Sequence, residues 1–233
     1  MEQSKNIKLN AGIYTIHPSE TVKILGYYLN INLNHDTYIN KIISKVNYRL
    51  LLLKDVSKYM CSNVKVLVYN AIIISVIVYV IPLIIDLNSK QLNVINVLVN
   101  KVARYCMGYK SFRWNNTTLM RKCGWLGGTH LIYYGVLCFI HKINFENLPE
   151  SLTNLFIYKD NLRGRYTRCP SSTKHKAISK ITRDNLFSRG LLYYKKIPDI
   201  LKTYNIKKFK REVKIYIKEN LPPDKLKIHT DYD

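Results

Sequence analysis

Hydrophobic residues in the first half of the chain recur at intervals of three and four, the spacing of one face of a helix. The first such stretch follows Asn34, a candidate N-cap, and has on one side Ile39, Ile42, Ile43, Val46, Leu50 and Leu53. A second, almost wholly apolar stretch covers residues 66–85 after Ser62 as candidate N-cap, and a third begins near Gln91 and ends at Gly108. Short links between three successive helices predict an up-and-down bundle.

Strand and turn patterns stand on either side of these helices. Residues 13–16 and 22–29 are typical of strands, and Pro18 lies in the short turn between them, which predicts a β-hairpin. Later in the chain we expect a helix over residues 117–122, a turn over 124–128 with Trp125 as a core anchor, a helix over 130–143 and a last helix over 209–217.

The predicted fold is therefore mainly α and has three parts. Residues 1–33 form a small N-terminal β-hairpin, residues 34–148 form a helical bundle, and residues 149–233 form a basic, loop-rich C-terminal region that ends in a helix. The loop-rich character rests on residues 163–180, which have few large apolar side chains and many basic ones.

The net charge of the chain limits the classes of partner that it can bind. It carries 37 Lys and Arg against 15 Asp and Glu, a formal net charge of +22, while 47% of its residues are hydrophobic, enough for a sizeable core. Nucleic acid and an anionic membrane surface are the polyanions that such a field attracts. We expect nucleic acid to be the partner, and the sequence leaves open whether it is RNA, DNA or a hybrid.

The apolar residues 66–85 keep a membrane interpretation open, because their length approaches the ~20 residues that cross a bilayer. Their many β-branched residues, Pro82 near their end and the amphipathic helices on both sides favour a buried central helix instead. The alternative is a membrane-associated basic protein anchored by residues 66–85.

Cysteine usage and the N-terminus indicate the compartment. The five cysteines are widely spaced, with no Cys-x-x-Cys pair, and no apolar stretch of signal-peptide type follows Met1. We expect a reducing, intracellular setting, without a choice between nucleus and cytoplasm. The histidines and cysteines do not combine at zinc-finger spacing, so we expect neither a metal nor another cofactor.

Several short motifs follow one another along the chain, and the first is Val-Lys-Ile-Leu-Gly-Tyr-Tyr-Leu over residues 22–29. This motif is similar to the segment after the catalytic loop in the reverse transcriptases of non-LTR (LINE-type) retrotransposons, where a Leu-Gly turn opens the primer-grip hairpin. Residues 100–108 resemble part of the helical thumb, and residues 123–126 resemble the Gly-Trp-Leu turn. Residues 190–198 resemble the stretch that many members write Trp-Asn-x-Leu-Pro, although Tyr194 and Lys195 stand where those members have Trp and Asn.

This resemblance implies a primer-grip-like hairpin at Leu25, Gly26 and Tyr27, followed by a thumb-like helical bundle that packs against a template–primer duplex. Polymerisation itself needs clustered carboxylates that hold two divalent metal ions. The sequence has no Asp-Asp pair, and Asp36, Asp55 and Asp86 occur singly. Asp36 and Asp86 are better explained as charges at helix ends. We therefore predict that the chain does not polymerise alone and that fingers and palm lie outside it.

The candidate phosphate-binding residues are the basic side chains that cluster in the sequence: Lys41, Lys45, Arg49, Lys101, Arg104, Lys110, Arg113, Arg163, Arg165, Arg168, Lys174 and Lys176. A further cluster, Lys207-Lys208-x-Lys210-Arg211, has two interpretations, a nuclear localisation signal or the polar face of the last helix. Besides the membrane alternative, a second hypothesis makes the chain the thumb subunit of a split polymerase, in which a separate palm-bearing chain docks on the hairpin.

Overall fold

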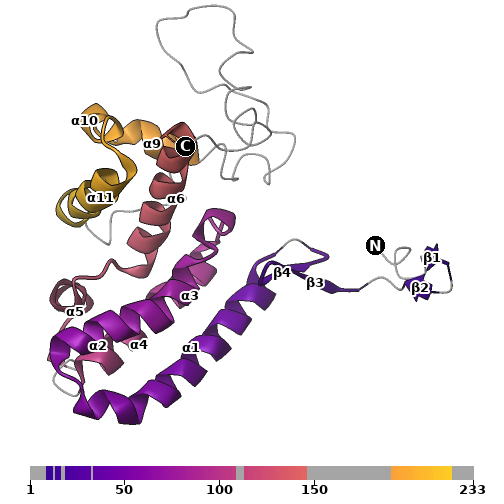
Figure 1. Cartoon of the computed structure of the whole chain (residues 1–233), viewed down its shortest axis with the longest axis horizontal. Coiled ribbons are helices and arrows are strands. Elements are labelled where there is room, and N and C mark those ends of the chain that lie inside the picture. Colours follow the sequence, from indigo (N-terminus) through magenta and orange to yellow (C-terminus); the bar gives the residue numbers. More distant parts are fainter. Residues whose placement is uncertain are drawn as a thin grey trace, which may run out of the picture.

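The computed structural model describes residues 9–12, 14–16, 19–32, 34–108, 113–145 and 190–221. Most of the described residues are helical, which confirms the mainly α fold. Figure 1 shows the β-hairpins at one end of a helical body, with α1 and α2 on one side of it and α9, α10 and α11 on the other.

The N-terminal segment is β-hairpin structure, as expected, but it consists of two hairpins, and the predicted pairing of residues 13–16 with residues 22–29 is wrong. Strand β1 (Leu9–Ala11) pairs antiparallel with β2 (Tyr14–Ile16), and β3 (Thr21–Ile24) pairs antiparallel with β4 (Tyr27–Asn30). The expected single strand over residues 22–29 is therefore wrong, because the chain reverses at Leu25 and Gly26. Both residues have positive φ angles, 48° and 86°, as a two-residue turn matching the strand twist requires.

The first and third predicted helices are confirmed as α1 (Asp36–Val56) and α4 (Ser89–Met107). The N-cap of α1 is His35 and not Asn34, whose Oδ1 accepts the backbone N–H of Asp36 at 3.3 Å. Helix α4 begins with a capping box between Asn88 and Gln91 and ends, as expected, at a glycine, Gly108, with φ of 74°. Helices α1 and α4 pack side by side.

The apolar stretch forms a segment of mixed helical type and not one regular helix. It consists of α2 (Ser62–Tyr69), the π-helical η3 (Asn70–Ile74), α3 (Ser75–Val78) and the 3-10 helix η4 (Ile81–Leu83). Ser62, the predicted N-cap, is the first helical residue of α2. The N-cap is Cys61, whose side chain makes no capping hydrogen bond. The inner face, with Tyr69, Ile73 and Ile77, is buried in the core.

The outer face of this segment is not covered, so the expectation of a buried central helix holds for one side only. Leu67 and Tyr79 are 68% and 67% exposed. Of the described residues, only the stretch over Ser62–Leu83 is long and apolar enough as a single helix to cross a membrane, and 33% of its most apolar window is buried. The bent pair of α5 and α6 passes the same test if taken as one span.

Helix α6 lies at the centre of the body. The expected helices over 117–122 and 130–143 are observed with slightly wider bounds as α5 (Asn116–Cys123) and α6 (Gly128–Phe145), and Gly124 (φ 66°) separates them in the left-handed region. Trp125 is buried, as predicted for a core anchor. Helix α6 packs against α4, η4, α9 and α11, so most of its circumference is buried.

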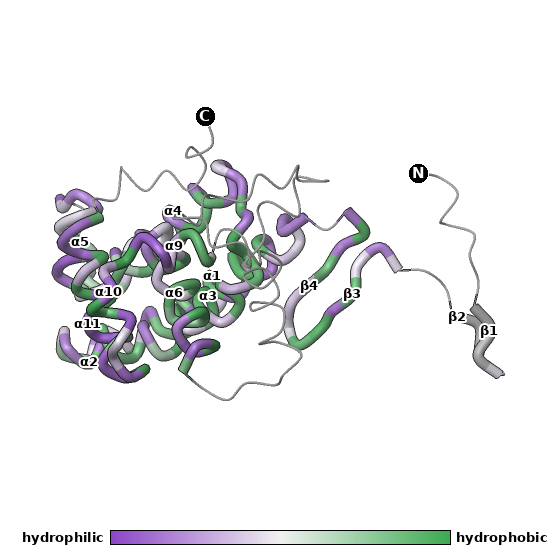
Figure 2. Tube along the Cα trace, turned by 90° about the horizontal axis from the view of Figure 1, so that it is seen from above, coloured by the Kyte–Doolittle hydropathy of each residue, from purple (hydrophilic) through white to green (hydrophobic). Residues whose placement is uncertain are grey.

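The described part of the C-terminal region is helical and rests on α6. It comprises α9 (Leu191–Lys196), α10 (Asp199–Lys202) and α11 (Ile206–Asn220), the last of which confirms and extends the helix expected over 209–217. The loop-rich character expected for residues 163–180 falls outside the described residues. Figure 2 shows hydrophobic residues gathered where α1, α3 and α6 lie together.

Candidate nucleic-acid interface

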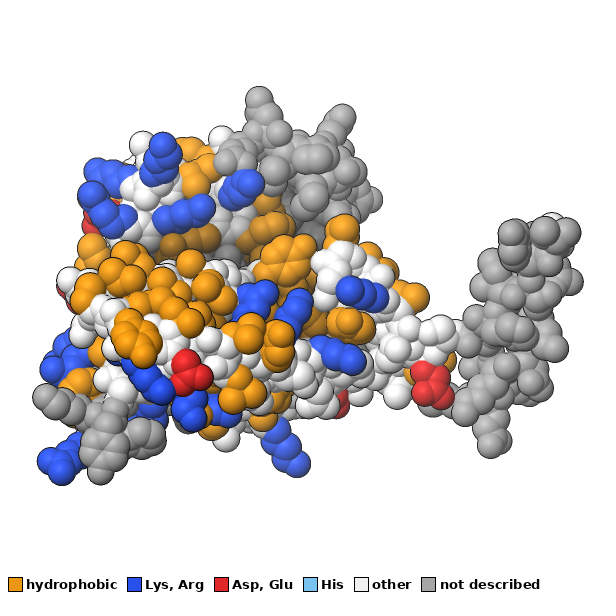
Figure 3. All heavy atoms as spheres, turned by 60° about the horizontal axis from the view of Figure 1, so that its bottom comes forward, with side chains coloured by type: hydrophobic (Ala, Val, Ile, Leu, Met, Phe, Trp, Pro, Cys, Tyr) orange, Lys and Arg blue, Asp and Glu red, His pale blue; other side chains and the backbone are white. Residues whose placement is uncertain are grey.

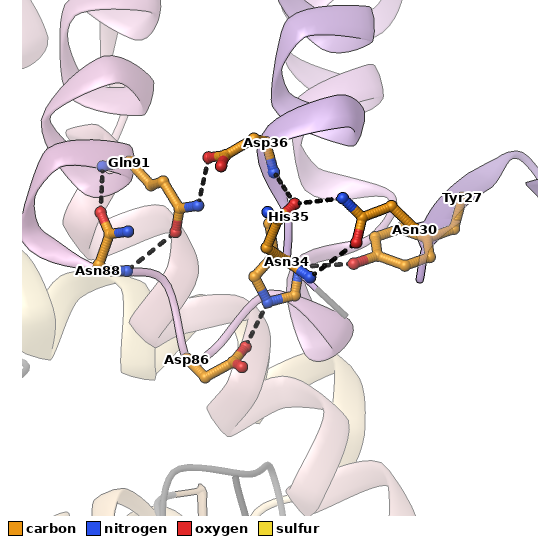
Figure 4. Close-up of polar contacts among 8 residues, drawn as sticks. All are labelled: Tyr27, Asn30, Asn34, His35, Asp36, Asp86, Asn88 and Gln91. Carbon is orange, nitrogen blue, oxygen red and sulfur yellow. Dashed lines mark hydrogen bonds and ion pairs between the residues drawn. The ribbon is translucent and has the colours of Figure 1, made fainter. Parts of the chain in front are cut away.

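A chain of hydrogen bonds, buried at Tyr27 and His35, fixes the β3–β4 hairpin to the helical body. The Tyr27 hydroxyl lies 2.5 Å from Nδ1 of His35, and Nε2 of His35 lies 2.7 Å from Oδ1 of Asp86 (Figure 4). Because a carboxylate only accepts, Nε2–H donates to Asp86, and Nδ1 is left to accept the Tyr27 O–H. Burial, with the charge of Asp86 acting in the same direction, raises the pKa of Tyr27 to about 12, so the phenol keeps its proton.

A second set of bonds ties the same region to α4. The amide of Asn30 donates to Asn34 Oδ1 at 2.9 Å, and Gln91 Nε2 donates to Asp36 Oδ1 at 2.7 Å. Figure 4 shows these side chains converging from β4, the start of α1 and the start of α4. We name the whole group the hinge cluster: Tyr27, Asn30, Asn34, His35, Asp36, Asp86, Asn88 and Gln91.

The hinge cluster explains both aspartates that the sequence assigned to helix ends. Asp36 does lie in the first turn of α1 and in addition accepts from Gln91. Asp86 lies in the turn between η4 and α4 and pairs with His35, a partner 51 residues away that no local pattern indicates. Over the residues that the structure describes, no group of three or more His, Cys, Asp or Glu side chains could hold a metal ion.

The three primer-grip-like residues separate into an exposed tip and a buried anchor. Leu25 is 86% exposed, while Tyr27 is buried and belongs to the hinge cluster. The tip is nonetheless held, because the hydroxyl of Tyr79 donates to the Leu25 carbonyl at 3.2 Å and its ring lies 3.9 Å from the position of a Cβ on Gly26.

Leu25 sits in a backbone conformation that costs a residue with a Cβ about 1–2 kcal/mol. We expect Leu25→Asn to raise the free energy of unfolding by about 1 kcal/mol, because Asn followed by Gly is the preferred pair in such turns. Urea denaturation followed by circular dichroism measures this change. Leu25→Ala removes the same exposed side chain but keeps the strain, so it should leave stability nearly unchanged; equal effects of the two variants would contradict the turn as the cause.

The predicted cluster Lys41, Lys45 and Arg49 lies along one edge of α1 and is continuous with the hairpin. Lys23 of β3 stands opposite Tyr28 of β4, and the ammonium groups of Lys23 and Lys41 both lie 5.7 Å from the centre of the Tyr28 ring. This distance suits a cation–π contact. We name this set the α1–hairpin surface: Lys23, Tyr28, Lys41, Lys45 and Arg49.

Within the described part of the chain, neither Lys41 nor Lys45 forms an ion pair. Arg49 is partly used inside the protein, because its guanidinium donates to the Ile72 carbonyl of η3. The contribution of Lys23 could not be found from helical periodicity. It becomes visible once the chain is known to reverse at Leu25 and Gly26, which sets Lys23 across from Tyr28.

The second predicted cluster does not join this surface. Lys101 Nζ donates to Asn47 Oδ1 at 2.8 Å, on the flank of α1 that faces α4. Arg104 donates to the Asn116 side chain at 3.0 Å and so holds α5 against α4. Arg113 is exposed, and Lys110 lies outside the described residues.

The third predicted cluster, Arg163, Arg165, Arg168, Lys174 and Lys176, also lies outside the described residues. The cluster Lys207-Lys208-x-Lys210-Arg211, for which two interpretations were open, lies on α11 with all four side chains exposed. That position agrees with the polar face of the last helix, and it leaves a localisation signal untested.

Comparisons of the chain with protein-family models, with curated protein sequences and with solved structures found no match.

Proposed function

We propose that the chain binds the sugar–phosphate backbone of nucleic acid through the α1–hairpin surface, as a region similar to the primer-grip hairpin and thumb of a non-LTR retrotransposon reverse transcriptase. One observation carries the proposal. The hinge cluster fixes the β3–β4 hairpin beside the start of α1. As a result, Lys23, Lys41 and Lys45 lie in one row, and none of them has an acidic partner among the described residues.

The dimensions of this row suit a phosphate backbone. Lys41 and Arg49 are eight residues apart in one helix, about 12 Å at ~1.5 Å per residue. One strand of a duplex carries about three or four phosphates over that length. Tyr28 supports the row, because its ring lies near both Lys23 and Lys41 and restricts where the two ammonium groups can lie.

The binding should depend steeply on salt, because each neutralised phosphate releases a counterion and adds about 0.9 to the slope of log affinity against log salt for duplex DNA. We expect Lys41→Gln/Lys45→Gln to reduce the magnitude of this slope by about 2. Fluorescence anisotropy with a labelled primer–template hybrid, duplex DNA and single-stranded RNA, over roughly 50–300 mM salt, measures both quantities and ranks the three ligands.

Lys54→Gln/Lys90→Gln is the matched control, since both lysines are exposed and lie outside the α1–hairpin surface. An affinity that does not change with salt, or an equal loss of slope in the control, would contradict the proposal.

The same proposal assigns the metal-binding carboxylates to a separate palm-bearing chain. Addition of nucleotides and magnesium to the isolated protein should then give no primer extension, and a co-purifying partner with an Asp-Asp loop would favour the split-polymerase hypothesis.

Membrane association is a second candidate, favoured by the exposed outer face of the segment over Ser62–Leu83. Val64, Leu67 and Leu83 are all exposed there. Figure 3 shows hydrophobic side chains forming a belt across the face of the molecule that it presents. Flotation with vesicles of anionic phospholipid distinguishes the candidates. Vesicle binding that survives high salt and carbonate indicates apolar insertion, whereas release by salt indicates a charge effect only.

A further inference from the structure

Helix α11 carries most of its basic side chains on one flank. Its buried face carries Phe209, Val213 and Ile217 against α6. Basic side chains occupy one flank at steps of four, three and four residues, which keeps them aligned over about three turns. We name this set the α11 stripe: Lys207, Arg211, Lys214 and Lys218. The acidic residues of the helix, Glu212 and Glu219, lie toward the other flank by the same helical geometry.

The α11 stripe concentrates positive charge on one part of the protein surface. Lys214 is half-buried, and its pKa is lowered by burial and by the charge of Lys218. Lys218 itself donates to the carbonyl of Gly124 at 3.0 Å, which fixes the end of the stripe beside the last turn of α5. Arg121 and Lys122 of that turn are exposed and extend the positive surface.

The other end of the stripe is hollowed. A shallow depression of about 350 Å³ at the start of α11 is lined by Asn205, Lys207, Lys208 and Arg211. The side chains around this depression make only weak interactions within the protein. Lys208 lies over the Tyr204 ring at 3.8 Å, and Arg211 pairs at the surface with its neighbour Glu212 at 2.9 Å. Such exposed pairs contribute little and exchange readily for a polyanion.

Two helices lie between the stripe and the α1–hairpin surface. Helix α11 packs on α6, α6 packs on α4, and α4 packs on α1, and Figure 1 shows α1 and α11 on different sides of the helical body. Because the axes of directly packed helices are already about 8–10 Å apart, the two intervening helices keep α1 and α11 beyond the ~8 Å screening length at physiological salt. Electrostatic coupling between the two surfaces is therefore weak.

We infer that the α11 stripe is a second phosphate-binding surface and that one molecule of this protein holds two segments of nucleic acid at the same time. The inference rests on the proposed function of the α1–hairpin surface. Lys207 and Lys218 are eleven residues apart, about 16 Å along the helix, over which one strand of a duplex presents about five phosphates. The stripe is therefore at least as long as the first surface.

Energy transfer between two short DNA duplexes, one with a donor and one with an acceptor label, tests for bridging by the full chain. Transfer should rise and then fall as protein is added, because excess protein occupies each duplex separately. We expect Lys41→Glu/Lys45→Glu and Lys207→Glu/Arg211→Glu each to reduce peak transfer at least fivefold, while each variant still binds a single duplex. Lys54→Glu/Lys90→Glu, with the same change in net charge, should bridge as the unaltered chain does.

The outcomes separate the two proposals. If the unaltered chain binds no duplex, the proposed function and this inference both fail. If it binds but gives no transfer, or if Lys207→Glu/Arg211→Glu bridges normally, the second surface is refuted and the first remains. Mass photometry of the complex completes the test, because one protein with two duplexes supports the inference, whereas two proteins with two duplexes show that bridging comes from self-association.

Discussion

His141→Ala is expected to lower the free energy of unfolding by about 3–5 kcal/mol, the range for truncation of a large buried ring. His141 is 0% exposed, and its ring stacks on Phe209 with 3.6 Å between centroids. Nδ1 lies 2.9 Å from the Tyr194 hydroxyl, and Nε2 lies 2.8 Å from the Tyr204 carbonyl. One side chain of α6 thus holds α9 and α11, and urea denaturation followed by circular dichroism measures the loss.

His141→Phe separates stacking from hydrogen bonding. It keeps a ring against Phe209 but removes the hydrogen bonds of His141 to the Tyr194 hydroxyl and to the Tyr204 carbonyl, so we expect a smaller loss of about 1–3 kcal/mol. Tyr194→Phe removes only the hydroxyl and should cost about 1 kcal/mol. Equal losses for the Ala and Phe variants would show that the ring contributes nothing beyond its hydrogen bonds.

The pH dependence of stability gives a second measure of His141. Burial lowers the pKa of His141, against the opposing effect of the Tyr204 carbonyl, and burial also lowers the pKa of His130. As the pH falls below the ordinary histidine pKa of about 6.5, the unfolded chain binds protons that the folded chain does not. Stability is therefore present above that pH and lost toward pH 5, by at most ~1.4 kcal/mol per pH unit for each histidine. His141→Phe should make this loss less steep, and an unchanged slope would exclude His141 as a cause.

Gly135→Ala is expected to cost about 1–3 kcal/mol of stability, although alanine is the better helix former. A Cβ at Gly135 would lie 2.5 Å from Cγ2 and 3.1 Å from Cβ of Ile81. Rotation of the alanine methyl cannot relieve this overlap, because the clashing atom is the Cβ itself. Helix α6 and η4 must therefore move apart. Thermal and urea denaturation measure the loss.

A double-mutant cycle with Ile81→Ala tests this explanation. Ile81→Ala alone removes buried contacts and should destabilise by about 2–5 kcal/mol. In Gly135→Ala/Ile81→Ala the overlap with Cγ2 is gone, so the double variant should be more stable than the sum of the single losses by at least about 0.5 kcal/mol. Additive losses would mean that the close approach of Gly135 to Ile81 does not limit the packing.

The candidate phosphate-binding residues show where a pattern in the sequence is informative. The spacing of Lys41, Lys45 and Arg49 placed them on one edge of α1, because positions four apart on a helix are neighbours whatever the helix packs against. The same reasoning grouped Lys101 with Arg104, yet each of these cations bonds to a different neighbouring helix, α1 and α5. The partners of a cation depend on which elements surround it.

The sequence alone determined the helical class of this protein, the position of most of its helices, the glycine ends of α4 and α5, and the excess of positive charge. Those features depend on side chains within a few residues of one another, so a local pattern is sufficient. Tertiary structure decided that the chain reverses at Leu25 and Gly26, that His35 joins Tyr27 to Asp86, and that α4 and α6 lie between α1 and α11. Each of these depends on contacts between segments distant in the sequence, which form only when α1, α4, α6 and α11 pack.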